Sequence, residues 1–249
     1  MRNARCLYFA LLLMSASAQA QVYQYFYWVT NWPISSGGNG HFYEAWAWGS
    51  TWTNANYWAT NRGGYLTTIT SRAENDFIFN FIKDKTNNLR HKLWEQTAPG
   101  WTWGPWVGGY RAPDGSWSWV TGEPFGFQNW VPGEPDNPAT KVHLAGTGVA
   151  FKPGDLWDGI DPALAMPGYV IEYESDPYLT SLQIIRRGTN QVEFTWERRR
   201  GRRYRLETAN TLPSSSWDTV VGDSGTNIVV DTLPGAQRFY RLLVEPEVN

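Results

Sequence analysis

The sequence predicts an α+β domain followed by a smaller all-β, sandwich-like domain, and three observations support this fold class. Residues 51–63 and 71–82 each space their apolar residues as an amphipathic helix does. Beyond residue 105 the chain changes to short strand-like segments separated by Gly and Pro turns. Residues 21–177 hold 14 of the 16 tryptophans and a formal charge of −6, whereas residues 178–249 hold two tryptophans and a charge of +2. This contrast predicts a domain boundary between the two ranges.

The first twenty residues have the layout of a cleavable secretory signal peptide. Arg2 and Arg5 form a basic start, an apolar run covers residues 7–14, and Ala18 and Ala20 provide the small residues of a cleavage site. The apolar run is too short to span a bilayer. We therefore expect cleavage after residue 20, no transmembrane anchor, and a protein secreted to the extracellular space or the periplasm. An uncleaved anchor is the alternative.

Packing must stabilise the mature chain, because Cys6, the only cysteine, lies within the predicted signal peptide. Exported domains often rely on disulfides, which this mature chain lacks. Aromatic residues make up 16% of the sequence, and one buried ring removes about 150–250 Å² of surface from water. The segment after the signal peptide, QVYQYFYWVTNW (residues 21–32), predicts an additional strand or an aromatic N-terminal arm.

Two helices are predicted in the first domain. The segment STWTNANYWATNRGG (50–64) has helical spacing, and Gly63 can end the helix. Its apolar face consists of Trp52, Ala55, Trp58 and Ala59. In SRAENDFIFNFI (71–82), Ser71 and Glu74 are spaced as a capping box, in which each side chain bonds the backbone N–H of the other residue. The apolar stripe of this second helix consists of Phe77, Ile78, Phe81 and Ile82.

Strands are predicted between and after the helices. The segment GGYLTTIT (63–70) alternates as a short strand does. The segments WVGGY (106–110), SWSWVTG (116–122) and YVIEYE (169–174) are bounded by turn residues. Two helices followed by loop-rich β structure make the first domain, residues 21–175, an α+β domain.

Several ordered blocks within residues 40–174 resemble the C-type lectin-like domain. The segment GGYLTTITSRAENDFI (63–78) comes first. WVGG (106–109) stands where the family has W-I-G-G, EPD (134–136) where it has E-P-N or Q-P-D, and WDG (157–159) where it has W-N-D. The resemblance implies the fold of that family, with two helices and loop-rich antiparallel β-sheets.

The resemblance also implies a ligand site. In sugar-binding members the proline of E-P-N is cis, so Pro135 is expected to follow a cis peptide, a form adopted by about 5–6% of X-Pro bonds. The flanking carboxylates then face one Ca²⁺, which takes about six to eight oxygen ligands, and sugar hydroxyls complete its shell. The residues expected to contact the ligand are Glu134, Asp136, Asn137 and Asp158. Of these, Glu134, Asp136 and Asp158 are the expected metal ligands.

The sequence departs from the family at two calcium-binding positions. Ala139 or Thr140 stands where the family supplies a further acid, and Gly159 replaces the second polar ligand of W-N-D. Asp161 or Asp155 would have to compensate, and Asp161 is taken as the fourth metal ligand. Water would fill the remaining positions around Ca²⁺. The E-P-D sequence mixes the mannose-type and galactose-type patterns, so it specifies no particular sugar.

The tryptophans near these blocks have two interpretations. Trp117, Trp119 and Trp130 alternate with polar residues in a strand-rich part and are expected to pack in the core. Trp101 and Trp103 lie in APGWTWGP, where Gly and Pro predict a loop. An exposed ring in such a loop can stack on a sugar face, so this pair is a candidate ligand contact, with plain packing as the alternative.

The second domain, residues 178–249, is predicted to be all-β. The segment QVEFTWERRRGRRYRLETA (191–209) has two alternating strands that predict a hairpin at Gly201, and RFYRLLVE (238–245) predicts a closing strand. The pattern resembles small fibronectin type III-like β-sandwiches. Glu197 and Glu207 lie on either side of the arginines of residues 198–205, which favours a solvated hairpin face over a nucleic-acid surface. Electrostatic binding of an anionic polysaccharide or a membrane surface is the alternative.

Three classes of function are compatible with these patterns. The favoured one is a secreted, non-enzymatic, lectin-like protein that binds a glycan or polysaccharide through the E-P-D segment, with or without Ca²⁺. The alternative is a calcium-independent protein-interaction or matrix adhesion protein, which the missing acid favours and which one scaffold can also support. A glycosidase needs two carboxylates about 5–9.5 Å apart across the scissile bond, and no separate nucleophile motif is present, so no catalytic residue is assigned. The residues His41, His91 and His143 lack the spacing of a zinc site.

Overall fold

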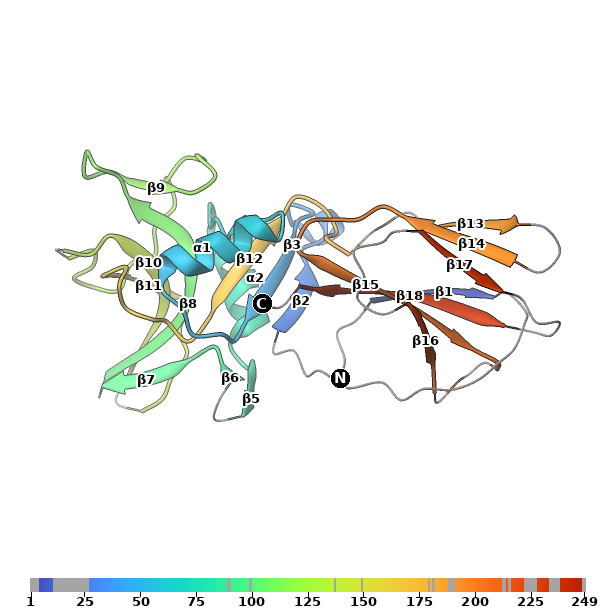
Figure 1. Cartoon of the computed structure of the whole chain (residues 1–249). Coiled ribbons are helices and arrows are strands. Elements are labelled where there is room, and N and C mark those ends of the chain that lie inside the picture. Colours follow the sequence, from blue (N-terminus) through green and yellow to red (C-terminus); the bar gives the residue numbers. More distant parts are fainter. Residues whose placement is uncertain are drawn as a thin grey trace. The chain divides into compact units, whose positions relative to one another are not determined.

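The computed structural model describes residues 5–10, 27–88, 91–98, 100–136, 138–148, 150–178, 180, 182–187, 191–211, 214, 216–221, 228–232 and 238–247. The chain divides into two compact units (Figure 1). The tryptophan-rich unit comprises Tyr25–Asp176. The arginine-rich unit comprises Met1–Gln24 and Pro177–Asn249.

Within the described residues, the tryptophan-rich unit contains a nine-stranded sheet and two α-helices (Figure 1). The strand order is β11-β10-β8-β12-β3-β2, with β4 paired to β12 and with β7 and β9 paired to β8. Pairing is antiparallel except between β8 and β12. The elements are β2 (Tyr27–Asn31), the 3₁₀ helix η1 (Ile34–Ser36), β3 (Phe42–Trp46), α1 (Trp52–Asn61), β4 (Tyr65–Leu66), α2 (Arg72–Ile82), a separate pair β5 (Thr86–Asn88) and β6 (His91–Lys92), β7 (Glu95–Ala98), β8 (Gly100–Arg111), β9 (Trp117–Trp119), β10 (Lys141–Gly148), β11 (Leu156–Ile160) and β12 (Tyr169–Tyr173).

Helix α1 forms where the sequence predicts it. Thr51 is the N-cap residue, and its side chain accepts a hydrogen bond from the backbone N–H of Asn54 at 3.4 Å. The helix is followed by Gly63, whose φ of +79° is a conformation that favours glycine. The predicted face turns inward, with Trp52, Ala55 and Ala59 buried and Trp58 half-buried.

Helix α2 also forms as predicted, but only one of the two hydrogen bonds of its predicted capping box is present. The Ser71 hydroxyl accepts from the Glu74 N–H at 3.2 Å, as expected. The Glu74 carboxylate accepts from the N–H of Thr70 at 2.8 Å, and not from the N–H of Ser71 as the capping box requires. The reason is burial: Glu74 is only 4% exposed, and its other oxygen is engaged by Tyr43 in the interior.

Aromatic rings fill the interior of the tryptophan-rich unit, as the composition predicts. Trp94, Trp106, Trp119 and Trp157 are the largest of the fully buried side chains. Trp119 is therefore a core residue, as expected, whereas Trp117 and Trp130 are only half-buried and pack against the core from its edge. The hydrogen bond from Trp157 Nε1 to Asn75 Oδ1, at 2.7 Å, ties β11 to α2.

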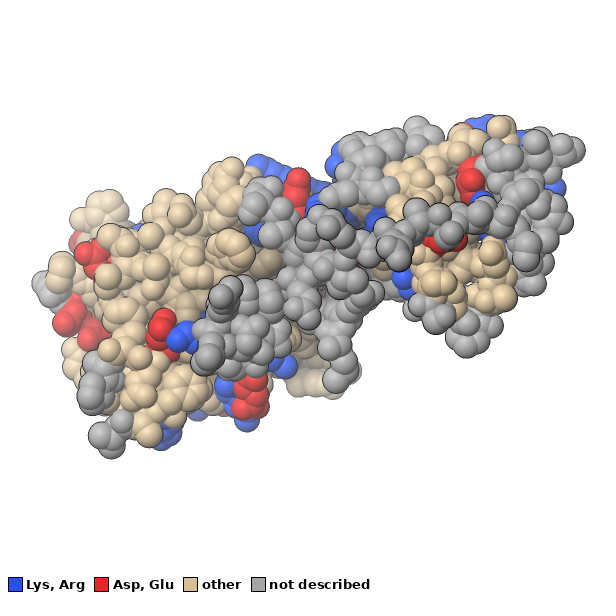
Figure 2. All heavy atoms as spheres, turned by 60° about the horizontal axis from the view of Figure 1, so that its bottom comes forward, with Lys and Arg blue, Asp and Glu red and all other residues tan. Residues whose placement is uncertain are grey.

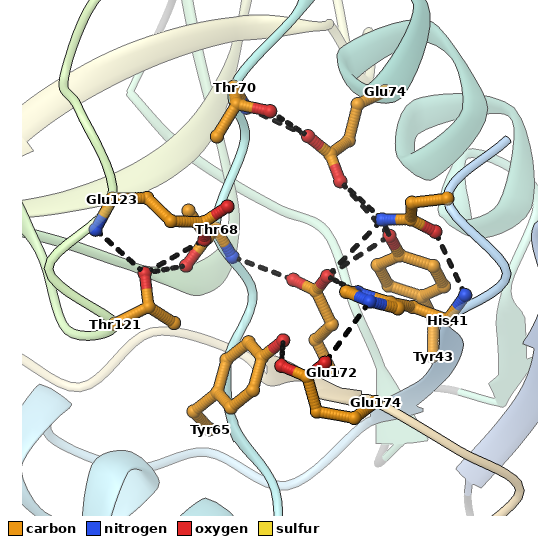
Figure 3. A network of polar contacts seen from close by, with 11 residues as sticks. His41, Tyr43, Tyr65, Thr68, Thr70, Glu74, Thr121, Glu123, Glu172 and Glu174 are labelled. Atoms are coloured by element: carbon orange, nitrogen blue, oxygen red, sulfur yellow. Dashed lines mark hydrogen bonds and ion pairs between the residues drawn. The ribbon is translucent and has the colours of Figure 1, made fainter.

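Two buried carboxylates, Glu74 on α2 and Glu172 on β12, meet around the hydroxyl of Tyr43 (Figure 3). The hydroxyl oxygen lies 3.0 Å from Glu74 Oε1 and 3.2 Å from Glu172 Oε1. Burial raises the pKa of Tyr43 far above its usual range, so the phenol stays protonated as a donor. Glu172 also accepts from the Thr68 N–H at 2.9 Å and contacts His41 Nδ1 at 2.7 Å. These bonds join β3, β12 and the start of α2.

This cluster predicts that stability falls as the pH rises. The Glu172 hydrogen bond raises the pKa of His41, and burial raises the pKa of Glu172, while Glu74 and Glu174 add negative charge around the histidine. Both groups hold their protons to higher pH in the folded state than in the unfolded chain. Their contribution is therefore complete below the unfolded pKa values and is lost as the pH rises through the folded ones. For His41 this loss occurs above about pH 6.5.

We expect His41→Gln to flatten this pH dependence. Urea unfolding, followed by tryptophan fluorescence at several pH values, measures it, because 14 of the 16 tryptophans lie within residues 21–177. The wild type should lose stability between pH 6 and pH 8, and the variant should lose clearly less. Equal losses in both proteins would show that His41 does not carry the effect.

The arginine-rich unit contains two sheets within the described residues (Figure 1). One has the order β1-β18-β15-β16 and the other the order β13-β14-β17. A ring contact between Phe194 and Tyr240, at 4.5 Å, joins a strand of each sheet. The strands are β1 (Arg5–Ala10), β13 (Leu182–Arg187), β14 (Gln191–Trp196), β15 (Arg202–Ala209), β16 (Asp218–Val221), β17 (Ile228–Thr232) and β18 (Phe239–Pro246).

The predicted hairpin at Gly201 is wrong. Strand β14 pairs with β13 and β17, whereas β15 pairs with β18 and β16. Residues 197–201 thus carry the chain from one sheet to the other. Alternation predicts strands but does not identify their partners, and here both strands turn apolar residues such as Phe194 and Leu206 inward.

The arginine run is also not a uniformly solvated face. Arg202 is 2% exposed, and its Nε donates to the Pro177 carbonyl at 3.1 Å. Its guanidinium lies 4.7 Å from the centre of the Tyr178 ring. Arg205 pairs with Glu207 at 3.0 Å. The run therefore contributes internal contacts that its charge pattern did not indicate.

The predicted signal peptide falls only partly within the described residues. Residues 5–10 form β1, antiparallel to β18, while residues 11–20 lie outside them, so cleavage after residue 20 stays a prediction. In the segment after it, for which a strand and an aromatic arm were alternatives, residues 27–31 form strand β2, and residues 21–26 lie outside the described residues. Among the described helices, none has the length and apolar character needed to cross a membrane.

Candidate functional site

The E-P-D loop, residues 129–138, is bound to β11 by its backbone. The N–H of Val131 donates to the Trp157 carbonyl at 2.9 Å, and the N–H of Trp157 donates to the Asn129 carbonyl at 2.8 Å. The peptide before Pro135 is cis, as predicted. Asn137, a predicted ligand residue, lies outside the described residues.

The two acids of the loop differ in their surroundings. Glu134 is half-buried, and its Oε2 accepts from the N–H of Asp136 at 3.0 Å. Burial raises the pKa of the Glu134 carboxyl, and the charges of Asp158 and Asp136 raise it further, against the opposing Asp136 N–H. Asp136 is exposed, and within the described part of the chain its carboxylate has no hydrogen-bond or ion-pair partner. Asp136 is therefore the acid of this loop that is open to a ligand.

The other predicted metal ligands have partners of their own within the protein. The Asp158 side chain is 9% exposed, and its Oδ2 lies 3.1 Å from Nε2 of the buried His143. Asp161 is exposed and its Oδ1 accepts from the Ala163 N–H at 2.8 Å, which closes a turn after β11. Asp155 pairs with Arg72 at 2.8 Å and is not available to compensate.

These residues do not fit a calcium site. Ca²⁺ needs about six to eight converging oxygens, but Asp158 is engaged by a histidine. Of the two residues at the position of the expected further acid, Ala139 is apolar and only 2% exposed, and Thr140 is half-buried and carries no charge. Across the described ranges, no three His, Cys, Asp or Glu side chains are grouped so that they could hold a metal ion.

The expected loop at Trp101 and Trp103 is wrong, because both residues lie on the long strand β8. They pair with Thr147 and Ala145 of β10 on one side and with β7 on the other, and both are half-buried. The glycine that suggested a loop is needed for packing: a Cβ on Gly104 would lie 2.5 Å from the Trp94 ring. Trp103 contacts the His143 ring edge to face and so belongs to the support of β10.

Beside the E-P-D loop lies an aromatic shelf, defined here as Trp117, Phe125 and Trp130. All three rings are half-buried. The rings of Trp117 and Trp130 are 4.9 Å apart, and those of Trp117 and Phe125 stack at 6.2 Å. Sequence reasoning assigned the two tryptophans to the core and did not single out Phe125; the density of aromatics in FGFQNW (125–130) was the available signal.

The visible face of the tryptophan-rich unit carries few charges (Figure 2). Its acidic and basic side chains occur in small, separate groups on a largely uncharged surface. The shelf residue Trp130 and the exposed carboxylate of Asp136 lie on one loop, which so offers a ring that can pack against an apolar ligand face and an acceptor for hydroxyl groups.

The chain is similar to solved structures of C-type lectin-like carbohydrate-recognition domains. Cow CD23, solved in the presence of a GlcNAc2Man3 oligosaccharide, is 20% identical, with 53% of this chain and 87% of that chain covered and a TM-score of 0.39. The mouse scavenger receptor C-type lectin domain is 17% identical, with coverages of 55% and 90% and a TM-score of 0.42. The Ca²⁺-independent C-type lectin SPL-2 from Saxidomus purpuratus is 21% identical, with coverages of 55% and 88% and a TM-score of 0.40.

No protein-family model and no curated protein matches the sequence. Because the solved structures have low sequence identities and low TM-scores, their functions are not transferred to this chain. The function is argued below from the residues of this chain.

Proposed function

We propose that this chain is a secreted, non-enzymatic carbohydrate-binding protein whose recognition surface consists of the E-P-D loop and the aromatic shelf. The observation that carries the proposal is that one loop holds both the exposed carboxylate of Asp136 and the half-buried ring of Trp130. A carboxylate accepts hydrogen bonds from sugar hydroxyls, and an aromatic ring packs against the apolar face of a sugar.

The remaining parts of the chain have supporting roles in this proposal. The predicted signal peptide would export the protein, and the arginine-rich unit, proposed as a small fibronectin type III-like β-sandwich, would follow the binding unit as an appended domain. The proposal includes no transmembrane anchor and no nucleic-acid partner.

A glycan array with the mature chain and with Asp136→Asn tests the function. A hydrogen bond to a charged group contributes about 1.5–3 kcal/mol, so we expect the variant to bind its glycan about tenfold to a hundredfold more weakly. Asp114→Asn is the matched control: this acid is exposed on the turn between β8 and β9, and asparagine can still accept from Ser116. Equal loss in both variants, or undiminished binding by Asp136→Asn, would contradict the proposed surface.

Protein binding on the same scaffold is the second candidate function. The missing acid favours it, because the buried Ala139 or its neighbour Thr140 stands where sugar-binding members of the resembled family carry an acid. A mature chain that binds no glycan on the array, but whose Asp136→Asn variant loses a protein partner, would support this second function over the first.

A further inference from the structure

Side chains on β11 alternate between its two faces, so Asp158 and its neighbour at position 159 point to opposite faces. Position 159 faces the E-P-D loop, since a Cβ placed on Gly159 would lie 3.4 Å from Glu134 Oε2 and 3.4 Å from Pro135 Cβ. Asp158 therefore lies on the other face, where its register partner on β10 is His143. Among the described residues, the carboxylate of Asp158 thus has its hydrogen-bonding contact on β10, with His143, and not with a residue of the loop.

His143 gives Asp158 a fixed partner inside the protein. Its Nε2 lies 3.1 Å from Asp158 Oδ2, and its Nδ1 donates to the Leu144 carbonyl at 2.7 Å. The ring is fully buried and meets the rings of Trp103 and Trp106 edge to face, at 6.0 and 5.8 Å. Two hydrogen-bonding contacts and two ring contacts therefore fix the imidazole.

Two positions at which the resembled family has further calcium ligands carry small residues here, Gly159 and Ala139 or its neighbour Thr140. A Cβ on Gly159 would lie 2.8 Å from the Cβ of Ala139, a separation that requires something to shift. A side chain at position 159 would therefore require a shift of Ala139, just before β10, or of β11 itself. The backbone bonds of Trp157 to Val131 and Asn129 hold the same segment of the loop without any metal ligand.

We infer that the Asp158–His143 contact replaces a divalent cation as the interaction that fixes β11 beneath the E-P-D loop, so that the loop keeps its shape without calcium. His143 is in this respect a positioning residue, because it is buried and acts through β11. The inference rests on the proposed function only in taking this loop as the ligand surface.

Hydrogen–deuterium exchange in residues 129–138 of the mature chain tests the inference. We expect the loop to exchange equally fast with calcium and with EDTA. His143→Leu removes the hydrogen-bonding partner of Asp158 and is expected to speed loop exchange at least about tenfold. His143→Gln, whose side-chain amide can still donate to Asp158, should restore most of the protection. Slower loop exchange in the wild type on adding calcium would overturn the inference. This comparison of the wild type with calcium and with EDTA can be made even if the His143→Leu variant does not fold.

Glycan binding with and without EDTA separates this inference from the proposed function. Equal binding in both buffers supports both. Binding that is lost in EDTA keeps the proposed function and overturns the calcium-independent loop. A protein that binds no glycan in either buffer overturns the proposed function, while the exchange experiment still decides whether calcium shapes the loop.

Discussion

Replacing Trp157 with alanine should lower the free energy of unfolding of the tryptophan-rich unit by about 3–5 kcal/mol. Its ring is fully buried where the core meets the E-P-D loop. The replacement also leaves Asn75 Oδ1 without the indole donor that lies 2.7 Å away. The ring centres around it, at 5.5 to 5.9 Å, belong to Trp119, Phe125, Phe127 and Trp130.

The matched control is Trp48→Ala, because Trp48 is 51% exposed. An exposed substitution of this kind usually changes stability by about 0.5 kcal/mol or less. Urea unfolding followed by circular dichroism measures both variants and avoids the loss of a tryptophan from the signal. A cost below about 1 kcal/mol for Trp157→Ala would mean that the aromatic interior can close around the lost ring.

Elements whose evidence is local could be predicted from the sequence. Helices α1 and α2 form at the expected residues, because capping and apolar spacing act within a few residues of one another. The Ser71–Glu74 pair shows that such local prediction fails when a side chain also has a partner that is distant in the sequence. Ser71 caps the helix as predicted, but Glu74 is drawn to Tyr43, which lies 31 residues earlier in the chain.

Strand partners could not be predicted from the same patterns. The alternation of residues 191–209 indicates two strands equally well for a hairpin and for two different sheets. Trp101 and Trp103 show the opposite error, since Gly and Pro suggested a loop where β8 continues. Gly104 is there because another side chain would meet Trp94 and the Leu144 carbonyl, which is a tertiary contact that no neighbouring residue reveals.

The E-P-D motif predicted where the candidate site lies, but it did not predict how all of the site's side chains are oriented. The cis peptide before Pro135 and the exposed Asp136 lie where the E-P-D segment indicates. The orientation of Asp158 depends on its cross-strand pairing with His143, whereas the sequence pattern indicates only that His143 lacks the spacing of a zinc site. The alternation of LWDGI (156–160) contained the signal, because it puts Asp158 and Gly159 on opposite faces.

Glu172→Ala should be the second most damaging change, with a cost of about 3–5 kcal/mol, as expected when one partner of a buried charged cluster is removed. Glu172 is 2% exposed and accepts from the Thr68 N–H at 2.9 Å. Removing this side chain leaves the Thr68 N–H without its acceptor and leaves His41 without the contact that its Nδ1 makes at 2.7 Å. Glu174→Ala is the control, since that side chain is 74% exposed, and it should cost about 1 kcal/mol or less.

Glu172→Gln separates the role of charge from the role of shape in this cluster. The Tyr43 hydroxyl has one hydrogen but lies within bonding distance of carboxylate oxygens on both Glu74 and Glu172. A glutamine at position 172 keeps an acceptor for the Thr68 N–H and removes one of the two buried negative charges, whose desolvation is costly. We therefore expect Glu172→Gln to be clearly more stable than Glu172→Ala and to lose part of the wild type's pH dependence. Equal destabilisation by both substitutions would show that the cluster depends on the charge of Glu172 itself.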